Sequence, residues 1–179
     1  TFTDLGILMV LIIILVFIVM AAQFESLVDP FVIMFSIPFA FTGIVLGLAV
    51  TQTPLGVMAL IGVSMLMGIV VKNGIVLIDY TILCRERGMG IITSVVTAGK
   101  SRLRPVLMTT LTTVLGMIPM AVGTGEGSEM WRSMGMTVAW GLSVSTLITL
   151  IIVPTVYAVF AANGVKRRRR KIRKALRNN

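Results

Sequence analysis

Five long apolar stretches constrain the fold of this 179-residue chain more than any other feature. They occupy residues 5–22, 30–50, 57–80, 105–122 and 131–162. A helix needs about 20 apolar residues to cross the hydrocarbon core of a bilayer, where it satisfies its own backbone hydrogen bonds. The sequence therefore predicts an all-α fold, in which residues 1–162 form a polytopic membrane bundle of five transmembrane helices.

The composition agrees with a membrane protein and argues against a soluble enzyme. Hydrophobic residues make up 56% of the chain and charged residues 13%, whereas a soluble domain has about 45–50% and about 25%. There is no nucleophile–base arrangement and no phosphate-binding loop, so we expect no enzymatic activity. The chain has no histidine and a single cysteine, Cys84, so we expect no metal site, no organic cofactor and no intrachain disulfide.

The basic residues predict the orientation of the spans. Residues 23–29, residues 81–104 and the tail at residues 163–179 fall on one side of the predicted bundle, and they carry 14 of the 16 lysines and arginines. Because basic residues concentrate in cytoplasmic loops, that side is predicted to be cytoplasmic and the N-terminus periplasmic. Five spans that start on the outer side without a leader insert poorly alone. We therefore expect the chain to be part of a longer protein with an upstream extracytoplasmic domain.

Two segments outside the predicted spans have a character of their own. Residues 163–179 form a polybasic cytoplasmic tail, for which membrane lipid is the expected partner. Nucleic acid is a weaker alternative because no aromatic residue is interleaved with the basic ones. In the connection at residues 81–104, Ile91, Ile92, Val95 and Val96 recur at helical spacing, which predicts a short amphipathic helix at the cytoplasmic surface rather than a plain linker.

Lys72 is the residue most in need of explanation, because it lies inside the third apolar stretch. A lysine at the centre of a membrane helix costs about 2.5–3.5 kcal/mol on insertion scales, and such residues mark ion paths, proton relays or structural ion pairs. The seven acidic residues all fall in loops or at the ends of spans. Asp79 shares the face of Lys72 but lies about 10 Å along the helix. We therefore expect the partner of Lys72 to come from another segment or another chain.

A second polar line follows the fourth apolar stretch. Arg102 and Thr109 are seven residues apart and share one helix face, and Thr110, Thr112 and Thr113 add hydroxyls beside it. Hydroxyls of this kind either line a water or proton path or bond the carbonyl one turn back. For Thr109, aligned with Arg102, we favour the first role.

Four motifs resemble the C-terminal membrane half of resistance-nodulation-division (RND) efflux transporters, and most closely their hydrophobe/amphiphile branch. They are GIVVKNGIVLIDY at residues 68–80, RERG at 85–88, RLRPVLMTTLTTVLGMIPM at 102–120 and GTGEGSE at 123–129. The resemblance covers nearly the whole chain. It implies that the five spans are helices eight to twelve of a twelve-helix domain.

The resemblance implies a proton-driven antiporter in the inner membrane of a bacterium. The intramembrane lysine of that family pairs with two aspartates on another helix, and Lys72 matches it. Arg102 and Thr109 match the arginine and threonine that complete the relay, with Asn73, Asp79 and Thr110 as supporting residues. The partners implied are two further copies of the permease, a periplasmic adaptor and an outer-membrane channel. The coupling ion is the proton, and the substrates are drugs and other amphiphiles.

Two alternatives to multidrug efflux stay open on the sequence alone. A related transporter could carry lipid, metal or protein, although the 13 methionines are scattered as packing residues rather than gathered as metal ligands. A membrane scaffold of a different class could use Lys72 only for a structural ion pair.

Overall fold

The computed structural model describes residues 2–177, and every regular element in that part of the chain is helical. The elements are α1 (Phe2–Phe24), α2 (Val28–Met34), α3 (Ile37–Thr51), α4 (Val57–Glu86), α5 (Ile91–Val122) and α6 (Ser128–Arg177). Counting α2 and α3 as one span, five helices are long and apolar enough to cross a membrane. The predicted all-α bundle of five spans is confirmed. Residues 1, 178 and 179, the outermost residues of the predicted membrane region and tail, lie outside the described residues.

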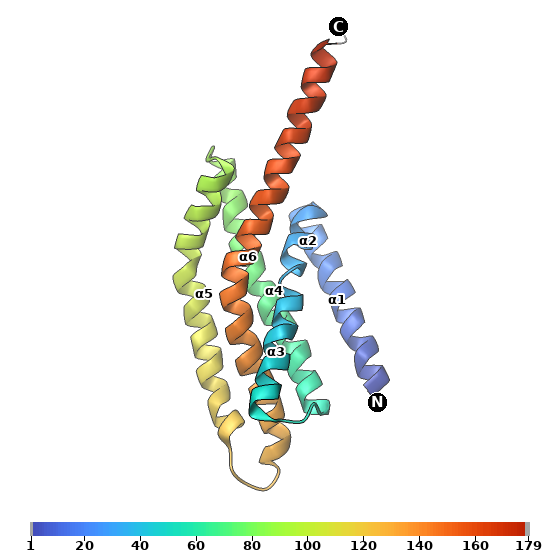
Figure 1. Ribbon diagram of the computed structural model, residues 1–179, viewed down its shortest axis with the longest axis vertical. Coiled ribbons are helices and arrows are strands. Elements are labelled where there is room, and N and C mark those ends of the chain that lie inside the picture. The colour runs from blue at the N-terminus through green and yellow to red at the C-terminus, as the bar shows by residue number, and fades with distance from the viewer. Residues whose placement is uncertain (1, 178–179) are drawn as a thin grey trace.

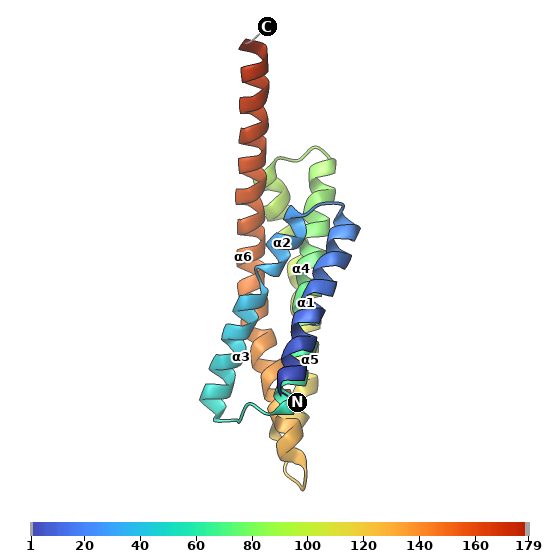
Figure 2. The same ribbon diagram turned by 90° about the vertical axis from the view of Figure 1, so that its right-hand side faces the viewer.

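The helices run up and down along one long axis (Figures 1 and 2). The N-terminal end of α1, the α3–α4 connection and the α5–α6 connection gather at one end of the bundle. The α1–α2 turn, the α4–α5 turn and the C-terminus gather at the other. Successive connections therefore alternate between the two ends of the bundle, as the predicted orientation of the spans requires.

The second span is broken rather than continuous. α2 ends at Met34, Phe35 and Ser36 form a turn, and α3 begins at Ile37 with Pro38 in its first turn. Proline has no amide hydrogen and its ring clashes with the carbonyl four residues earlier, so the helix cannot run through this point undisturbed. The Ser36 hydroxyl donates to the Ile33 carbonyl at 2.7 Å, which satisfies part of the interrupted backbone.

Residues 91–104 do not form a separate short helix. They are the first turns of α5, which runs without interruption through Pro105 to Val122. Of the apolar residues of this segment, Val95 packs partly buried against the core, whereas Ile92 is 76% exposed; Ser94 and Ala98 are fully buried. The polybasic tail is not a separate segment either, because α6 continues as a helix as far as Arg177.

α6 lies at the centre of the bundle and packs against α3, α4 and α5. Small residues let these helices approach closely, as is common where membrane helices meet. On α3, Gly43 faces Val144 and Gly47 faces Trp140 of α6 so tightly that an added methyl group would overlap either side chain. On α4, Gly62 meets Met134 of α6.

The core divides into two buried clusters along the bundle axis. One draws residues from all six helices and includes Met20, Ile33, Ile78 and Val153. The other joins α3, α4 and α6 and includes Ile44, Leu66 and Leu142. α1 contributes only Met20 to the buried residues of the described chain and otherwise lies along the outside.

Candidate functional site

One face of α4 is left uncovered, and that face carries both charged residues of the third span. Ala59, Leu66 and Val70 on the opposite side are buried against the bundle. Ile61, Met65, Gly68, Lys72, Asp79 and Leu83 recur every three, four or seven residues and are all exposed. The helix therefore divides into a packed apolar face and an open face that carries Lys72 and Asp79.

Lys72 lies near the middle of α4, far from either end of the span. Asp79 is two turns nearer the end of the helix, about 10 Å along its axis. No other acidic residue falls within α4 before Glu86, and the described part of α5 contains none. The lysine thus presents its charge on an open face, at a depth where this chain supplies no carboxylate.

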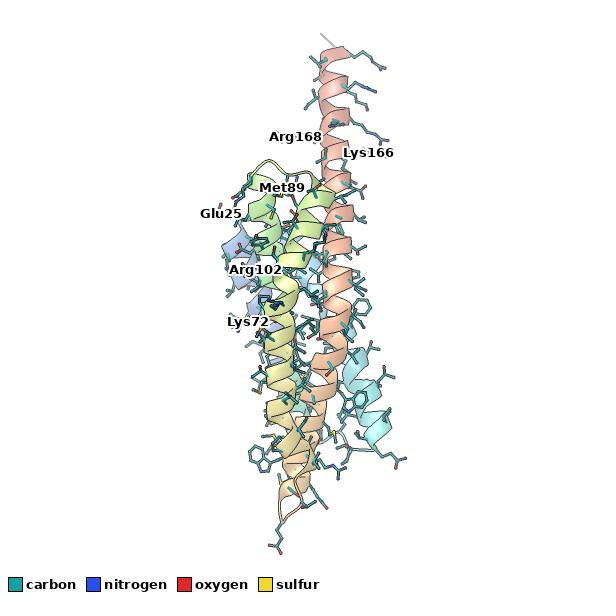
Figure 3. The ribbon with its side chains drawn as sticks, turned by 90° about the vertical axis from the view of Figure 1, so that its left-hand side faces the viewer. Glu25, Lys72, Met89, Arg102, Lys166 and Arg168 are labelled. Atoms are coloured by element: carbon teal, nitrogen blue, oxygen red, sulfur yellow. The ribbon has the colours of Figure 1, made fainter. Side chains whose placement is uncertain are left out.

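Arg102 of α5 lies next to the α4 face through an aromatic contact. Its guanidinium carbon is 4.8 Å from the ring centroid of Tyr80, close enough for a cation–π interaction. The Nε of Arg102 is buried and has no hydrogen-bond partner in the described chain. Figure 3 shows Lys72 and Arg102 at neighbouring heights in the bundle, where α4 and α5 lie side by side. Arg102 is therefore held beside α4 by an aromatic ring, and its buried Nε donates no hydrogen bond within the described chain.

Thr109 lies on the exposed part of α5, two turns from Arg102. Because α4 and α5 run antiparallel and Tyr80 meets Arg102, a step of about 10 Å along each helix brings Thr109 to the height of Lys72. The Thr109 hydroxyl donates to the Pro105 carbonyl at 3.0 Å, so Thr109 makes the bond one turn back that the sequence pattern did not favour for it. Its oxygen keeps lone pairs that can accept a further hydrogen bond. Thr112 and Thr113 make similar bonds one turn back along the helix.

Asn73 and Thr110 lie apart from this open face. Asn73 is 6% exposed and Thr110 is 8% exposed, so both point into the bundle. The Thr110 hydroxyl is 3.0 Å from that of Thr146, which joins α5 to α6. Lys72 and Asp79 therefore share the open face of α4, and Arg102 contacts Tyr80 next to it. Thr109 is exposed on α5, whereas Asn73 and Thr110 lie on the inner side.

Two residues that contact the candidate site residues, Tyr80 and Thr146, were not predicted from the sequence. Tyr80 closes the motif that contains Lys72, so its position was visible, but the contact with Arg102 depends on the register between two antiparallel helices. Thr146 sits in a long apolar helix with no nearby charge to draw attention to it. Its pairing with Thr110 spans 36 residues of sequence.

A second polar cluster closes the end of the bundle beside the C-terminal part of α6. An Arg85 Nη donates to the Tyr157 hydroxyl at 3.3 Å, which connects α4 to α6. Asp29 of α2 lines the same cavity with Arg85 and Tyr157. This cluster joins three helices and does not reach the open face of Lys72.

The comparisons with known proteins agree with the geometry. A family model described as the AcrB/AcrD/AcrF family matches residues 2–161. The chain is 43% identical over 162 residues to the swarming motility protein SwrC of Bacillus subtilis, covering 90% of this chain and 15% of that protein. It is 39% identical over 143 residues to the multidrug resistance protein MdtC of Erwinia tasmaniensis, covering 79% of this chain and 14% of that protein.

A solved structure gives the same answer for the fold. The crystal structure of a heavy metal efflux pump matches with a TM-score of 0.79 and 29% identity, covering 88% of this chain and 15% of that one. The chain thus spans about one seventh of the length of the proteins that it matches. The matched part contains all five spans, the Lys72 face and the Arg102–Tyr80 contact. The chain belongs to the AcrB/AcrD/AcrF family of resistance-nodulation-division efflux permeases.

Proposed function

We propose that this chain is the C-terminal membrane portion, helices eight to twelve, of a proton-driven multidrug or amphiphile efflux permease. The observation that carries the proposal is Lys72, an exposed cation in mid-span at a depth where this chain has no carboxylate. Family membership supports efflux as the activity, and two MdtC relatives are multidrug resistance proteins.

Lys72, Arg102 and Thr109 would form the basic half of a proton relay. The acidic half would come from the membrane helices that this chain does not include. With those acids ionised, the Lys72 ammonium would hold them by charge-assisted hydrogen bonds, which are stronger than neutral ones. Protonation of the acids would remove that attraction and release Lys72. The Arg102 Nη atoms and the Thr109 oxygen would then offer a neighbouring donor and acceptor.

Amphiphiles fit this chain better than metal ions as the transported substrate. The heavy metal pump shares the fold at 29% identity, but the chain has no histidine and a single cysteine, which is buried. Soft metals prefer thiolate, thioether or imidazole ligands. Substrate contacts would lie mainly in the part of the full protein outside this chain.

The full protein would work as a trimer with a periplasmic adaptor and an outer-membrane channel. Its membrane would be the bacterial inner membrane, with the N-terminal end of this chain facing the periplasm and the C-terminal end facing the cytoplasm. The clustering of basic residues at one end of the bundle supports that orientation.

The relay is tested by Lys72→Ala and Lys72→Arg in the full-length permease. We expect Lys72→Ala to reduce proton-coupled efflux of a fluorescent amphiphile about tenfold or more, because the acids lose the ammonium that their protonation would release, and a hydrogen bond to a charged group is worth about 1.5–3 kcal/mol. Lys72→Arg keeps the charge but not its geometry, and we expect it to lose most of the activity too. The amount of permease in the membrane should stay unchanged.

Lys100→Ala is the matched control, because it removes a lysine from an exposed position on α5 near the predicted cytoplasmic end of the helix. Normal efflux by both Lys72 variants would contradict the relay. Loss of the protein from the membrane would favour the scaffold alternative, in which the lysine makes only a structural ion pair.

A further inference from the structure

The C-terminal quarter of α6 has no packing partner in the described chain. The helix leaves the bundle and continues along its long axis, as Figures 1 and 3 show. Every residue from 162 to 177 is exposed. Nine of the last 12 described residues are lysine or arginine, and no acidic residue follows Glu129. We refer to residues 165–177 as the basic helix.

The basic helix is amphipathic, although most of its residues are lysine or arginine. At about 100° per residue, Val165, Ile172 and Leu176 fall within about 40° of one another and form a narrow apolar stripe. These three side chains are 38%, 53% and 76% exposed. Arg168 and Arg169 flank the stripe on its two sides. The remaining basic residues occupy the rest of the surface.

Like charges oppose each other along the basic helix. Basic residues four positions apart lie next to one another on a helix surface and repel. Five such pairs occur: Lys166–Arg170, Arg167–Lys171, Arg169–Arg173, Arg170–Lys174 and Arg173–Arg177. A helix loaded in this way gains stability from an anionic surface that neutralises it, so the charge pattern indicates an anionic partner.

A lipid surface fits this pattern better than a nucleic acid. A helix with a basic polar face and an apolar stripe lies in the plane of the headgroups, with the stripe facing the acyl chains. Single-stranded nucleic acids are bound through aromatic stacking, and the basic helix has no aromatic residue. The apolar part of α6 ends at Ala162, so the surface of the membrane that holds the bundle would lie next to the base of this helix.

A basic helix that continues straight along the bundle axis can bring only its first residues close to the membrane surface. Twelve residues extend about 18 Å along the axis, whereas charge attraction fades over about 8 Å at physiological salt. Docking therefore needs a bend, and the sequence has a weak point at the right place. Asn163 and Gly164 are poor helix formers just before the basic helix. No neighbour lies within 4 Å of the position that a Cβ of Gly164 would take, so the bend meets no obstacle.

We propose that residues 165–177 bend at Asn163–Gly164 and dock on the anionic phospholipid headgroups of the membrane that holds the bundle. The Val165, Ile172 and Leu176 stripe faces the acyl chains, and the basic residues contact lipid phosphates. The docked helix fixes the C-terminal end of α6 to the bilayer surface. This role is independent of the transported substrate and of the relay at Lys72.

The test uses the full-length protein in lipid nanodiscs, with a polarity-sensitive NBD fluorophore at one of two positions. Cys84→Ser and the same change at any other native cysteine remove the native thiols, and Ile172→Cys or Lys174→Cys introduces the label. These positions lie about 160° apart around the helix, so Lys174 is the matched control on the opposite face. Nanodiscs contain phosphatidylcholine alone or phosphatidylcholine mixed with phosphatidylglycerol.

We expect phosphatidylglycerol to increase the emission of the Ile172 label at least about twofold and shift it to the blue, since the stripe enters the apolar layer. The Lys174 label should stay in water and change little. The change should weaken in Gly164→Ala, which stiffens the bend. No response at Ile172, or equal responses at both positions, would overturn the proposal. So would a larger response to an added oligonucleotide than to phosphatidylglycerol.

Trypsin gives a second measurement that needs no label, because it cleaves after the basic residues of the helix. In the unlabelled chain, phosphatidylglycerol should slow this cleavage. The double variant Ile172→Ser and Leu176→Ser keeps every charge and should lose most of the protection. Equal protection of the two chains would show that the stripe plays no part, and the docked geometry would be wrong.

Discussion

At the scale of single residues, the notable feature is how the chain holds Arg102. The guanidinium is covered by the Tyr80 ring at 4.8 Å rather than paired with a carboxylate. An aromatic face attracts a cation without neutralising its charge. The ring therefore holds Arg102 in position without neutralising its charge, which suits the proposed relay. Tyr80 would act as a positioning residue for the relay.

Tyr80→Leu should lower the free energy of unfolding of the full-length protein by about 1–2 kcal/mol, because it removes the ring under Arg102 and leaves the guanidinium half-buried. Tyr80→Phe keeps the ring face and should cost clearly less. Thermal unfolding in one detergent compares the two variants. A loss for Tyr80→Phe as large as that for Tyr80→Leu would assign the effect to the hydroxyl instead.

The sequence singled out Lys72, Arg102 and Thr109 as candidate site residues because their chemistry conflicts with their surroundings. Lys72 stood out as a charge in an apolar stretch, and the spacing of seven residues put Arg102 and Thr109 on one face. Tyr80 and Thr146 raised no such conflict, since either residue is ordinary in a membrane helix. Their contacts depend on how α4, α5 and α6 are placed side by side, and that placement comes from packing across the whole bundle.

At the scale of helices, glycine decides how closely α3 and α6 approach. Gly43 and Gly47 are four residues apart and face Val144 and Trp140. A Cβ at Gly43 would lie 2.8 Å from the Cβ of Val144, and one at Gly47 would overlap the Cβ of Trp140. Neither Cβ can move without moving the backbone. The spacing of these two helices is therefore set by the absence of two methyl groups.

Gly47→Ala should destabilise the bundle by about 1–3 kcal/mol, the usual cost of overpacking a filled contact. Gly68→Ala is the control, because Gly68 lies on the open face of α4 with no neighbour within 4 Å of its added Cβ. Its effect should be small or stabilising, since alanine favours a helix over glycine by about 1 kcal/mol. Denaturant unfolding of the two variants in matched detergent measures the difference. Equal losses would mean that helix propensity, not packing, controls both sites.

Helix boundaries were predictable only where local sequence controls them. The five spans follow from apolar length, and the break before α3 reflects Pro38. The continuity of α5 did not follow from sequence, because Pro105 and the basic residues before it suggested a boundary. Proline is tolerated inside a membrane helix where neighbours compensate for the lost hydrogen bond. Likewise, residues 165–177 contain no proline or glycine that would end α6 where it leaves the bundle.

At the scale of the whole molecule, the two ends of the bundle differ in charge. The end that holds the C-terminus carries the Arg85–Arg87 turn and the basic helix. The other end carries Glu126 and Glu129, with Arg132 as its one nearby basic residue. The pattern supports the proposed orientation of the bundle, and Thr124 and Met89 lie in connections at its opposite ends.

Thr124→Cys should react with a membrane-impermeant maleimide in intact spheroplasts, and Met89→Cys should react only after the membrane is opened. Both positions lie outside the apolar spans, so local exposure does not explain a difference. Cys84 is 1% exposed and should give little background. Labelling is measured on full-length protein by gel shift. Labelling of Met89→Cys from outside would reverse the proposed orientation.

The position of α1 has a mechanical consequence. In its most apolar window only 6% of residues are buried, compared with 56% for α4. Met20, the buried residue of α1, lies near the end that leads into α2. Tilting α1 about that end breaks few contacts, whereas moving α4 would disrupt many of the buried contacts of the core. α1 can therefore act as a lever. A force on its N-terminal end would rotate the helix about Met20, and the movement would be passed first to α2 and to the break before Pro38.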